Sequence, residues 1–283
     1  MVAVLKPSIV ITTKNRKEEL LYAIESCLGQ IGNPEIFVFD DGSSDGTYEY
    51  VKHNFPNIKI HQEVNSIGLI NARTKAAGFV DGDIIFSIDD DAIFSKNDIV
   101  FETLKDFNYP KIGAVAMPLI NIKSSPEILQ YAPDNDKLYF TSHFIGTAHA
   151  LRKDVFLRLG GYRSYLVRQG EESDYCIRLL ENGYNIKLGR SCPIIHNESP
   201  KRDSSEIKYY EARNNILFAL VNIPMLFVLP HLVINIFHLL MKSDQYFKTV
   251  LKGISSGISE YIKRKEIVRK PVSIQTYIKF RGL

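Results

Sequence analysis

The sequence predicts an α/β protein with a mostly parallel β-sheet, flanking helices and a helical C-terminal extension. Its 283 residues are 45% apolar and 24% charged, a composition that is ordinary for a globular enzyme with a sizeable core. The first half alternates short apolar runs with helical patterns, which favours a parallel sheet covered by helices. Acidic residues follow two of these runs, at the strand ends where such sheets bind ligands.

The strands expected in the first half are short, and helical patterns separate them. Asn15 and Glu18 have the spacing of a capping box, so we expect the first helix to open there. Its expected apolar face contains Leu20, Ala23, Ile24, Cys27 and Leu28. The pattern predicts strands at 8–12, 35–39, 58–61 and 84–88, and further helices at 48–53 and 69–78.

The pattern changes after residue 108. The polar, Pro-containing stretch 121–140 is expected to be an irregular or lid-like connection. A final apolar run leads into His196, and a histidine in such a place is more often structural than a ligand. The predicted elements are a strand at 112–117, a helix at 154–159 closed by Gly160-Gly161, a helix at 171–182 capped by Gly183, and a strand at 192–195.

Asp89, Asp90 and Asp91 stand together at the end of the run 84–88. Three adjacent like charges repel one another, and a hard divalent cation would relieve that repulsion because it favours carboxylate oxygens. A solvated acidic turn is the alternative for an isolated triplet. Asp40 and Asp41 follow another predicted strand, however, and the two clusters are expected at the same sheet edge. This favours a binding site.

The cysteines and the charge distribution restrict the compartment and the partners. Cys27, Cys176 and Cys192 fit neither a disulfide framework nor a zinc motif, which favours a reducing compartment. The first residues show no signal-peptide pattern. The whole chain has a net charge of +3, whereas residues 242–283 carry ten Lys or Arg and three Asp or Glu. This basic end suggests a membrane or nucleic acid as partner, and a solubilising tail is the alternative.

The segment 216–241 is strongly apolar but is interrupted by Asn222, Pro224 and Pro230. A membrane span needs about 20 predominantly apolar residues, so we expect two helices that lie on a membrane or pack on the main domain, rather than a span. Residues 246–269 mix apolar and basic side chains, as interfacial helices do. Packing on the core or a homodimer contact remains the alternative.

Five motifs follow one another along the chain: Ser8–Arg16 with the sequence SIVITTKNR; DDGSSDGT at 40–47; Asn65-x-x-Gly68 followed by Ala72-Arg73; Asp89-Asp90-Asp91; and Gly146–Lys153 followed by Gly160-Gly161-Tyr162 and Gly170-Glu171-Glu172-Ser173-Asp174. Together they resemble the family 2 glycosyltransferases, nucleotide-sugar-dependent enzymes of the GT-A fold. The resemblance covers about residues 7 to 215. Thr74 departs from it, because the family commonly has Asn there.

The resemblance implies which residues bind the nucleotide. Thr12 and Asp40 would hold the base and ribose, with Asn15 in the neighbouring turn, and a carboxylate suits N–H and hydroxyl donors. Arg73 would lie near the base or the diphosphate, where a guanidinium fork fits. Asp89 is one end of the family's DxD motif. We also count Asp90 among the nucleotide-binding residues. UDP or dTDP is favoured over GDP as the nucleotide.

The resemblance also implies a divalent metal, Mn²⁺ or Mg²⁺. Asp89 and Asp91 are the two ends of the DxD motif, and Asp91 is the more direct ligand. His196 falls where some relatives place a third ligand. Such a metal bridges the two phosphates and stabilises the departing nucleoside diphosphate.

Glu172 occupies the position of the family's catalytic base, which would take the proton of the acceptor hydroxyl as that hydroxyl attacks in line, with inversion. Glu171 is adjacent and is the alternative base. Capping of a helix start remains the plainer interpretation of these acids. Asp174 and Arg178, four residues apart, are expected to be a structural or acceptor-orienting pair. Gly146 is assigned to the acceptor or sugar side.

The sequence therefore predicts an inverting, metal-dependent glycosyltransferase acting on a glycan or lipid-linked glycan acceptor. The chain has no Trp, so the Gln-x-x-Arg-Trp motif of processive synthases is absent and a single-addition enzyme is favoured. A relative that binds nucleotide sugar without turnover is the alternative, and no nucleic-acid-binding motif is present. The expected location is cytoplasmic, peripheral on the cytoplasmic face of a membrane. The expected units are a catalytic domain at 1–215, with halves at 1–107 and 108–215, and an extension at 216–283.

Overall fold

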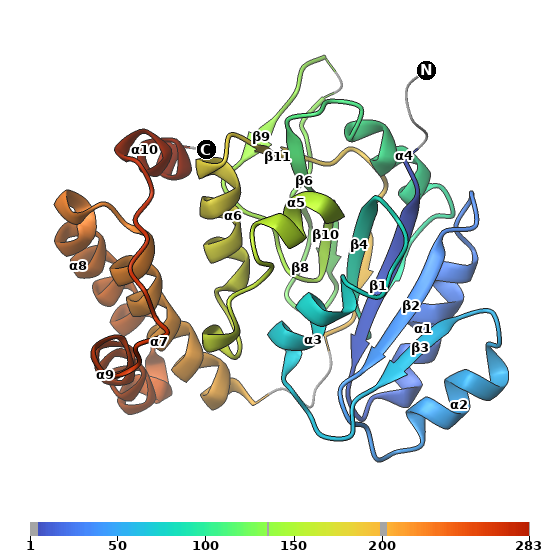
Figure 1. Ribbon diagram of the computed structural model, residues 1–283, viewed down its shortest axis with the longest axis horizontal. Coiled ribbons are helices and arrows are strands. Elements are labelled where there is room, and N and C mark those ends of the chain that lie inside the picture. Colours follow the sequence, from blue (N-terminus) through green and yellow to red (C-terminus); the bar gives the residue numbers. More distant parts are fainter. Residues whose placement is uncertain (1–4, 135, 199–202, 283) are drawn as a thin grey trace.

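The computed structural model describes residues 5–134, 136–198 and 203–282, and its main sheet forms the centre of the molecule (Figure 1). Within the described residues this sheet has eight strands. Their order across the sheet is β3 (Lys59–Gln62), β2 (Glu35–Asp40), β1 (Pro7–Thr13), β4 (Ile84–Asp89), β10 (Ala148–Arg152), β6 (Ile112–Ala116), β11 (Asn185–Leu188) and β9 (Phe140–Thr141). The predicted mostly parallel α/β fold is confirmed, because β3, β2, β1 and β4 pair in parallel and so do β6 and β11.

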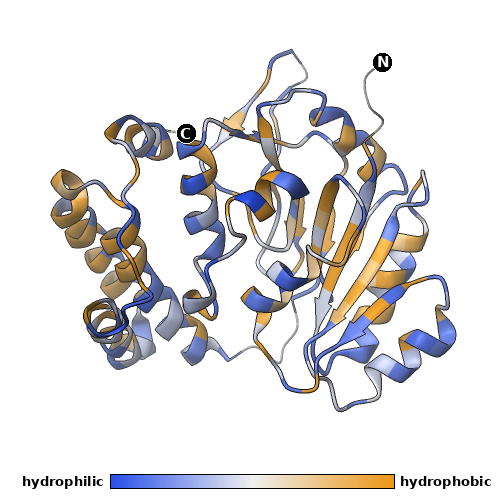
Figure 2. Cartoon of the chain, viewed as in Figure 1, coloured by the Kyte–Doolittle hydropathy of each residue, from blue (hydrophilic) through white to orange (hydrophobic). Residues whose placement is uncertain are grey.

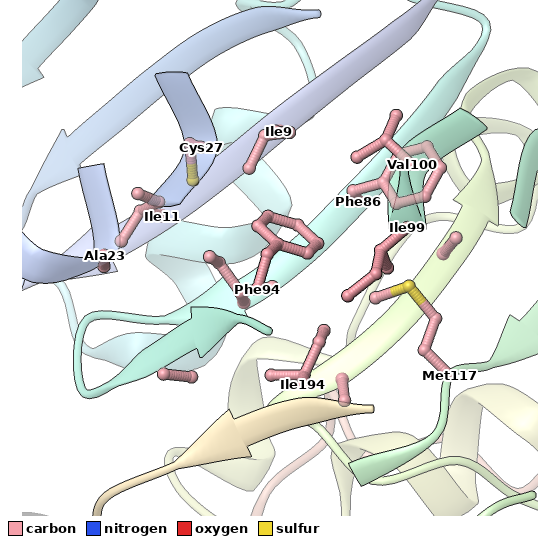
Figure 3. Close-up of a cluster of buried hydrophobic side chains, with 14 of the residues drawn as sticks. Ile9, Ile11, Ala23, Cys27, Phe86, Phe94, Ile99, Val100, Met117 and Ile194 are labelled. Atoms are coloured by element: carbon pink, nitrogen blue, oxygen red, sulfur yellow. The ribbon is translucent and has the colours of Figure 1, made fainter. Parts of the chain in front are cut away.

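The central strands are apolar because both faces of the sheet are covered. Strand β1 is buried from Ser8 onward, and its side chains alternate between two cores. Figure 3 shows the core under α1, where Ile9 and Ile11 of β1 lie near Cys27 of the helix and Phe86 of β4. The helices of the main domain are α1 (Lys17–Leu28), α2 (Thr47–Asn54), α3 (Leu69–Ala76), α4 (Ile99–Asp106), α5 (Lys153–Arg158) and α6 (Glu171–Glu181).

The capping box predicted for α1 is wrong. The helix begins at Lys17, and no side chain caps it. Asn15 instead has a positive φ of 53°, and its side-chain oxygen accepts a hydrogen bond from the amide of Ser44 at 2.8 Å. Asn15 therefore joins two loops at the sheet edge. Of the residues placed on the apolar face of this helix, Leu28 at its last position is half exposed and the other four are buried.

Strands β10 and β11 of the main sheet have no counterpart among the predicted elements, and each carries a buried polar side chain. Strand β10 runs antiparallel between β4 and β6. Its His149 is fully buried and bonds through Nε2 to the hydroxyl of Tyr162 at 2.9 Å. Strand β11 contains Lys187, which is 1% exposed and pairs with Asp106 of α4. The partners that permit such burial are distant in the sequence, so the local pattern does not reveal these strands.

A second sheet places His196 near the acidic strand end. Its strands are β5 (Ala92–Phe94), β12 (Ile194–His196), β7 (Leu119–Asn121) and β8 (Ser125–Leu129), in that order. His196 pairs with Ala92, the residue directly after the Asp triplet. The expectation that 121–140 is irregular is thus wrong in part, since β8 lies within it and β9 begins at its last residue.

The C-terminal helices form a separate layer against α6 (Figure 1). They are α7 (Ser204–Asn222), α8 (Met225–Met241), α9 (Phe247–Lys263) and α10 (Ile274–Gly282). Helix α7 continues without a break past residue 215, and the predicted division there stays a prediction. Among the described residues, no single helix has the length and apolar character of a membrane span; α8 and the following segment Asp244–Lys263 meet these criteria only as a pair bent by 117°.

Candidate active site

Polar side chains gather where β1, β2 and β4 end side by side. Thr12 of β1 lies opposite Asp89 of β4, and Thr13 lies opposite Asp40 of β2. The carboxyl ends of these parallel strands share one sheet edge, as the sequence predicts. Thr12 is buried, and its hydroxyl has no hydrogen-bond partner within the described chain, so it is available to a ligand.

Asp89, Asp91 and His196 form a group that could hold a metal ion. One ligand atom from each residue lies within 4.8 Å of the others, and Asp91 and His196 are buried. The His196 Nε2 atom is 3.1 Å from the Asp91 Oδ1 atom. Two carboxylates and an imidazole suit Mn²⁺, and the arrangement fits the metal implied by the sequence.

Two arginines offset the charge of the triplet. Arg73 of α3 pairs with Asp89. Arg16, which the sequence analysis did not assign to the site, lies 2.8 Å from Asp90 and 3.3 Å from Asp91. Arg16 is the last residue of the motif Ser8–Arg16. Its basic side chain, in a loop next to the predicted acidic sheet edge, was the signal in the sequence that could have identified it. Arg16 lies directly before α1 and Arg73 lies in α3, so the positions of both arginines depend on how these helices pack.

The three carboxyls of the triplet have different environments. Burial favours a higher pKa for Asp89, but the charge of Arg73 and a hydrogen bond from Thr147 at 2.7 Å hold that pKa below its ordinary value. Burial raises the pKa of Asp90 to about 6, although Arg16 and the Thr13 hydroxyl act in the opposite direction. Asp90 bonds to Arg16 and Thr13, and it lies outside the group that could hold a metal.

Two aspartates of the segment 40–47 fix its position through hydrogen bonds. Asp40 is fully buried, and its carboxylate accepts from the amide of Ser43 at 2.8 Å and from Gln62 Nε2 at 2.9 Å. Asp41, the second acid of this cluster, accepts from the amides of Ile67 at 2.7 Å and Gly68 at 3.0 Å. These bonds tie the segment to the turn before α3. A direct contact of Asp40 with a nucleotide stays a prediction.

Glu171 and Glu172 open α6 beside the triplet. Arg73 donates to Glu171 Oε1 at 3.2 Å and also pairs with Asp89, so one guanidinium connects the two acidic groups. Glu171 is buried, whereas Glu172 is partly exposed. Burial, and then the neighbouring charge of Glu171, raise the pKa of Glu172 to about 8. Burial also raises the pKa of Glu171.

Gly146 lies against this pair. A Cβ atom on Gly146 would come within 2.3 Å of Glu172 Oε1 and within 2.9 Å of Arg73 Nη1. No side chain fits between these groups, so the absence of a Cβ lets the backbone approach Glu172. The structure therefore brings Gly146 and Glu172, which are 26 positions apart in the sequence, to one place.

Asp174 and Arg178 connect helices. Asp174 is buried and accepts hydrogen bonds from Arg178 at 2.9 Å, Arg163 at 2.8 Å and Asn222 of α7 at 2.9 Å. Arg178 also donates to the carbonyl oxygen of Gly161 at 2.7 Å. These contacts agree with the structural reading of the pair. A role toward the acceptor stays a prediction.

Comparisons with known proteins agree with this geometry. A family model described as glycosyl transferase family 2 matches residues 8–160. The chain is 29% identical over 219 residues to the glucosyl-dolichyl phosphate glucuronosyltransferase of Haloferax volcanii, a match that covers 68% of this chain and 69% of that protein.

Solved structures show the same fold. The mannosyltransferase PcManGT from Pyrobaculum calidifontis, in complex with GDP-Man and Mn²⁺, is similar with a TM-score of 0.62 and 18% identity, over 99% of this chain and 79% of that chain. S. aureus TarS is similar with a TM-score of 0.59 and 15% identity, over 75% of this chain and 40% of that chain. This chain thus spans less than half of TarS. The predicted GT-A fold is confirmed.

Proposed function

The chain belongs to glycosyl transferase family 2 and is a glycosyltransferase; we propose that it moves a sugar, with inversion, from a nucleoside diphosphate sugar to a hydroxyl of a lipid-linked glycan. The observation that carries the proposal is the connection of two acidic groups through Arg73. One group, with Asp89 and Asp91, suits the donor diphosphate. The other, with Glu172, suits the acceptor hydroxyl.

The donor side is assigned to the strand ends. Asp89, Asp91 and His196 would hold Mn²⁺ or Mg²⁺, which when bound would offset the charge of the departing diphosphate. Thr12 offers an unpartnered hydroxyl next to Asp89, and the loop at 40–47 closes the side where the base would lie. We favour UDP or dTDP as the nucleotide. The GDP-Man bound by PcManGT makes GDP the comparison to test.

Glu172 acts as the base in this proposal, and Glu171 orients Arg73. Glu171 is buried with its Oε1 atom bonded to Arg73, whereas Glu172 is partly exposed and can meet an acceptor. A carboxylate with a pKa of about 8 is a stronger base than an ordinary glutamate, provided that it is ionised. As it takes the acceptor proton, the hydroxyl oxygen attacks the anomeric carbon opposite the leaving diphosphate. Inversion follows from this in-line displacement.

The lipid-linked acceptor is proposed from two observations. The relative from Haloferax volcanii is named for a glucosyl-dolichyl phosphate substrate. Helix α8 of this chain, in addition, exposes many apolar side chains, and it is the most apolar helix in Figure 2. His231 is buried and its two ring nitrogens bond to the Tyr277 hydroxyl at 3.0 Å and to Asn235 at 2.7 Å. The exposed side chains of α8 include Met225, Leu226, Leu229, Val233, Ile234, Phe237 and Met241.

Helix α9 adds positive charge beside this apolar face. Its inner face packs tightly on α7, where a Cβ on Gly253 would lie 2.4 Å from the Tyr209 carbonyl oxygen. Its outer face exposes Phe247, Leu251, Ile258 and Ile262 and, beside them, Lys248, Lys252 and Lys263. Apolar residues flanked by lysines are typical of helices that lie on anionic membranes. We therefore propose peripheral binding through α8 and α9, and the predicted cytoplasmic face stays part of that proposal.

The proposal is tested with a donor panel and one acceptor class. UDP-, dTDP- and GDP-sugars are compared by thermal shift with and without Mn²⁺, because a true donor stabilises the native state by mass action. The stabilising donor is then incubated with polyprenyl phosphate-linked sugars, and the product is analysed by mass spectrometry and for anomeric configuration. Transfer with inversion supports the proposal. Metal-dependent donor binding without transfer to any lipid-linked or free glycan would contradict it.

A further inference from the structure

The loop that precedes Glu171 has an unusual backbone. Val167, Gln169 and Gly170 all have positive φ angles, of 64°, 66° and 82°. Only glycine adopts this region without steric cost, and a β-branched residue such as Val167 is an outlier there. Such backbone persists only where surrounding contacts hold it. The segment 165–170, called here the base loop, must therefore be held from outside.

Asn214 of α7 holds the base loop from one side. Its side-chain amide nitrogen lies within hydrogen-bond distance of three carbonyl oxygens of the loop, those of Leu166 at 2.8 Å, Arg168 at 2.7 Å and Gln169 at 2.6 Å, so its two N–H groups are shared among three acceptors. Asn214 is 2% exposed, so these bonds are shielded from water. Only an amide at this position can donate to several carbonyls and still accept a bond through its oxygen.

Arg213 completes the clamp. Its Nη1 atom donates to Asn214 Oδ1 at 2.5 Å, which fixes the orientation of the amide, and its Nη2 atom donates to the carbonyl oxygen of Tyr165 at 2.9 Å. The guanidinium is itself held by Glu260 of α9, with Nε and Oε1 2.7 Å apart. A chain of contacts thus runs from α9 through Arg213 and Asn214 to the residues directly before α6.

We propose that Asn214 and Arg213 are positioning residues for glycosyl transfer, which hold the base loop so that Glu172 points at the acceptor, with Glu260 as their anchor on α9. The inference rests on the proposed role of Glu172 as base. The donor residues at the strand ends do not depend on this clamp, because strand register and the two arginines position them. Loss of the clamp therefore affects transfer and spares donor binding.

The first experiment compares Asn214→Ala with Asn215→Ala. Asn215 is the next residue of the same helix, and its amide donates only within α7, to the Glu211 carbonyl oxygen at 2.9 Å. We expect Asn214→Ala to lower kcat by about 10- to 100-fold, since a small misplacement of a reacting group has effects of this size. The affinity for the nucleoside diphosphate in the presence of metal should stay within about twofold of the parent value, because the clamp does not position the residues at the strand ends. Glu260→Gln, a milder change, should lower kcat less. Equal kcat values for Asn214→Ala and Asn215→Ala would overturn the proposal.

A double-mutant cycle separates positioning from general destabilisation. If Asn214 acts through Glu172, then Asn214→Ala adds little to the loss already caused by Glu172→Gln, because groups that act as a unit are not additive. If the losses of kcat in the two single variants multiply fully in the double variant, the proposal is overturned.

Amide hydrogen exchange provides a readout that needs no activity. Exchange in residues 165–172 should be faster in Asn214→Ala than in the parent or in Asn215→Ala, while exchange in β1 and β4 is unchanged. Unchanged exchange in the base loop would overturn the clamp itself. Faster exchange in an enzyme that transfers no sugar would instead support the clamp and count against the proposed function.

Discussion

The carboxylates at the end of β4 and those at the start of α6 lie on either side of Arg73, but different parts of the chain position them. Asp89 to Asp91 are placed by the register of β4 with β1, in a part of the sheet built from consecutive strand–helix units. Glu171 and Glu172 follow a base loop held by side chains of α7, more than forty residues later in the sequence. The acids of the proposed donor side therefore come from consecutive strand–helix units, with only His196 added from a later strand, whereas the base side depends on contacts with α7.

Removal of a metal ligand should have the largest effect. Asp91→Asn keeps the size and shape of the side chain but removes a negative charge from the group that Asp91 forms with Asp89 and His196. Because a bound cation contributes several kcal/mol of stabilisation to the developing charge, we expect transfer to fall by roughly 1,000-fold. Metal-dependent binding of nucleoside diphosphate, measured by calorimetry, should be lost.

Asp90→Asn is the matched control for that change. Asp90 bonds to Thr13 and Arg16 and lies outside the possible metal group, so its substitution should leave the metal dependence in place. Equal loss of metal-dependent binding in both variants would contradict the assignment of Asp91.

Substitution of the base should have the next largest effect. Glu172→Gln keeps the size of the side chain but cannot accept the proton, so we expect transfer to fall by roughly 100-fold or more, with donor affinity retained. Glu171→Gln is the comparison, and single-turnover rates measure both. A dead Glu171→Gln and an active Glu172→Gln would move the assignment by one residue.

The lysines of α9 should control binding to anionic vesicles. Each Lys near such a surface contributes about 1 kcal/mol, so replacing Lys248, Lys252 and Lys263 by Ser should weaken binding roughly 100-fold in a sedimentation assay. The apolar face of α8 should leave a residual affinity that salt does not abolish.

The control for this charge change replaces Lys52, Lys105 and Lys111, which are exposed on the main domain, with the same loss of net charge. Equal weakening by both triple variants would show that total charge, rather than the α9 surface, governs binding. Absence of binding by the parent protein to anionic vesicles would contradict the membrane proposal altogether.

The smallest expected effect is a pH dependence near neutrality. Glu172 must be ionised to act as base, and its pKa is raised to about 8, so kcat/KM should rise about fivefold from pH 7 to pH 8. Folding stability should change in the opposite direction. The native state holds this proton more tightly than the unfolded chain, so stability falls as the pH rises from the ordinary glutamate pKa toward 8.

Glu172→Gln provides the check on both pH effects, because it removes the titrating group. Its free energy of unfolding, measured by urea denaturation from pH 5 to pH 8, should fall less steeply than that of the parent. Parallel pH curves for parent and variant would assign the dependence to another group.

The fold class, the positions of the first four strands along the chain, the acidic strand ends and the basic C-terminal end could all be predicted from the sequence. These features depend on local patterns: apolar runs, turn residues and charges close together in the chain. The helix 171–182 was predicted to within a residue for the same reason, since Gly170 and Gly183 bound a periodic segment. The motifs that indicate the family lie in these same regions.

The partners of these residues could not be predicted, because they come from distant parts of the chain. Strands β10 and β11 carry His149 and Lys187, whose burial requires Tyr162 and Asp106 from other elements. Arg16 joins the acid cluster through the packing of α1, and Asn214 reaches the base loop only because α7 lies against it. The structure likewise shows that α8 exposes apolar side chains, while its His231 is buried and bonds to Tyr277 of α10. Such pairings join residues that are far apart in the chain, and a local pattern carries no signal for them.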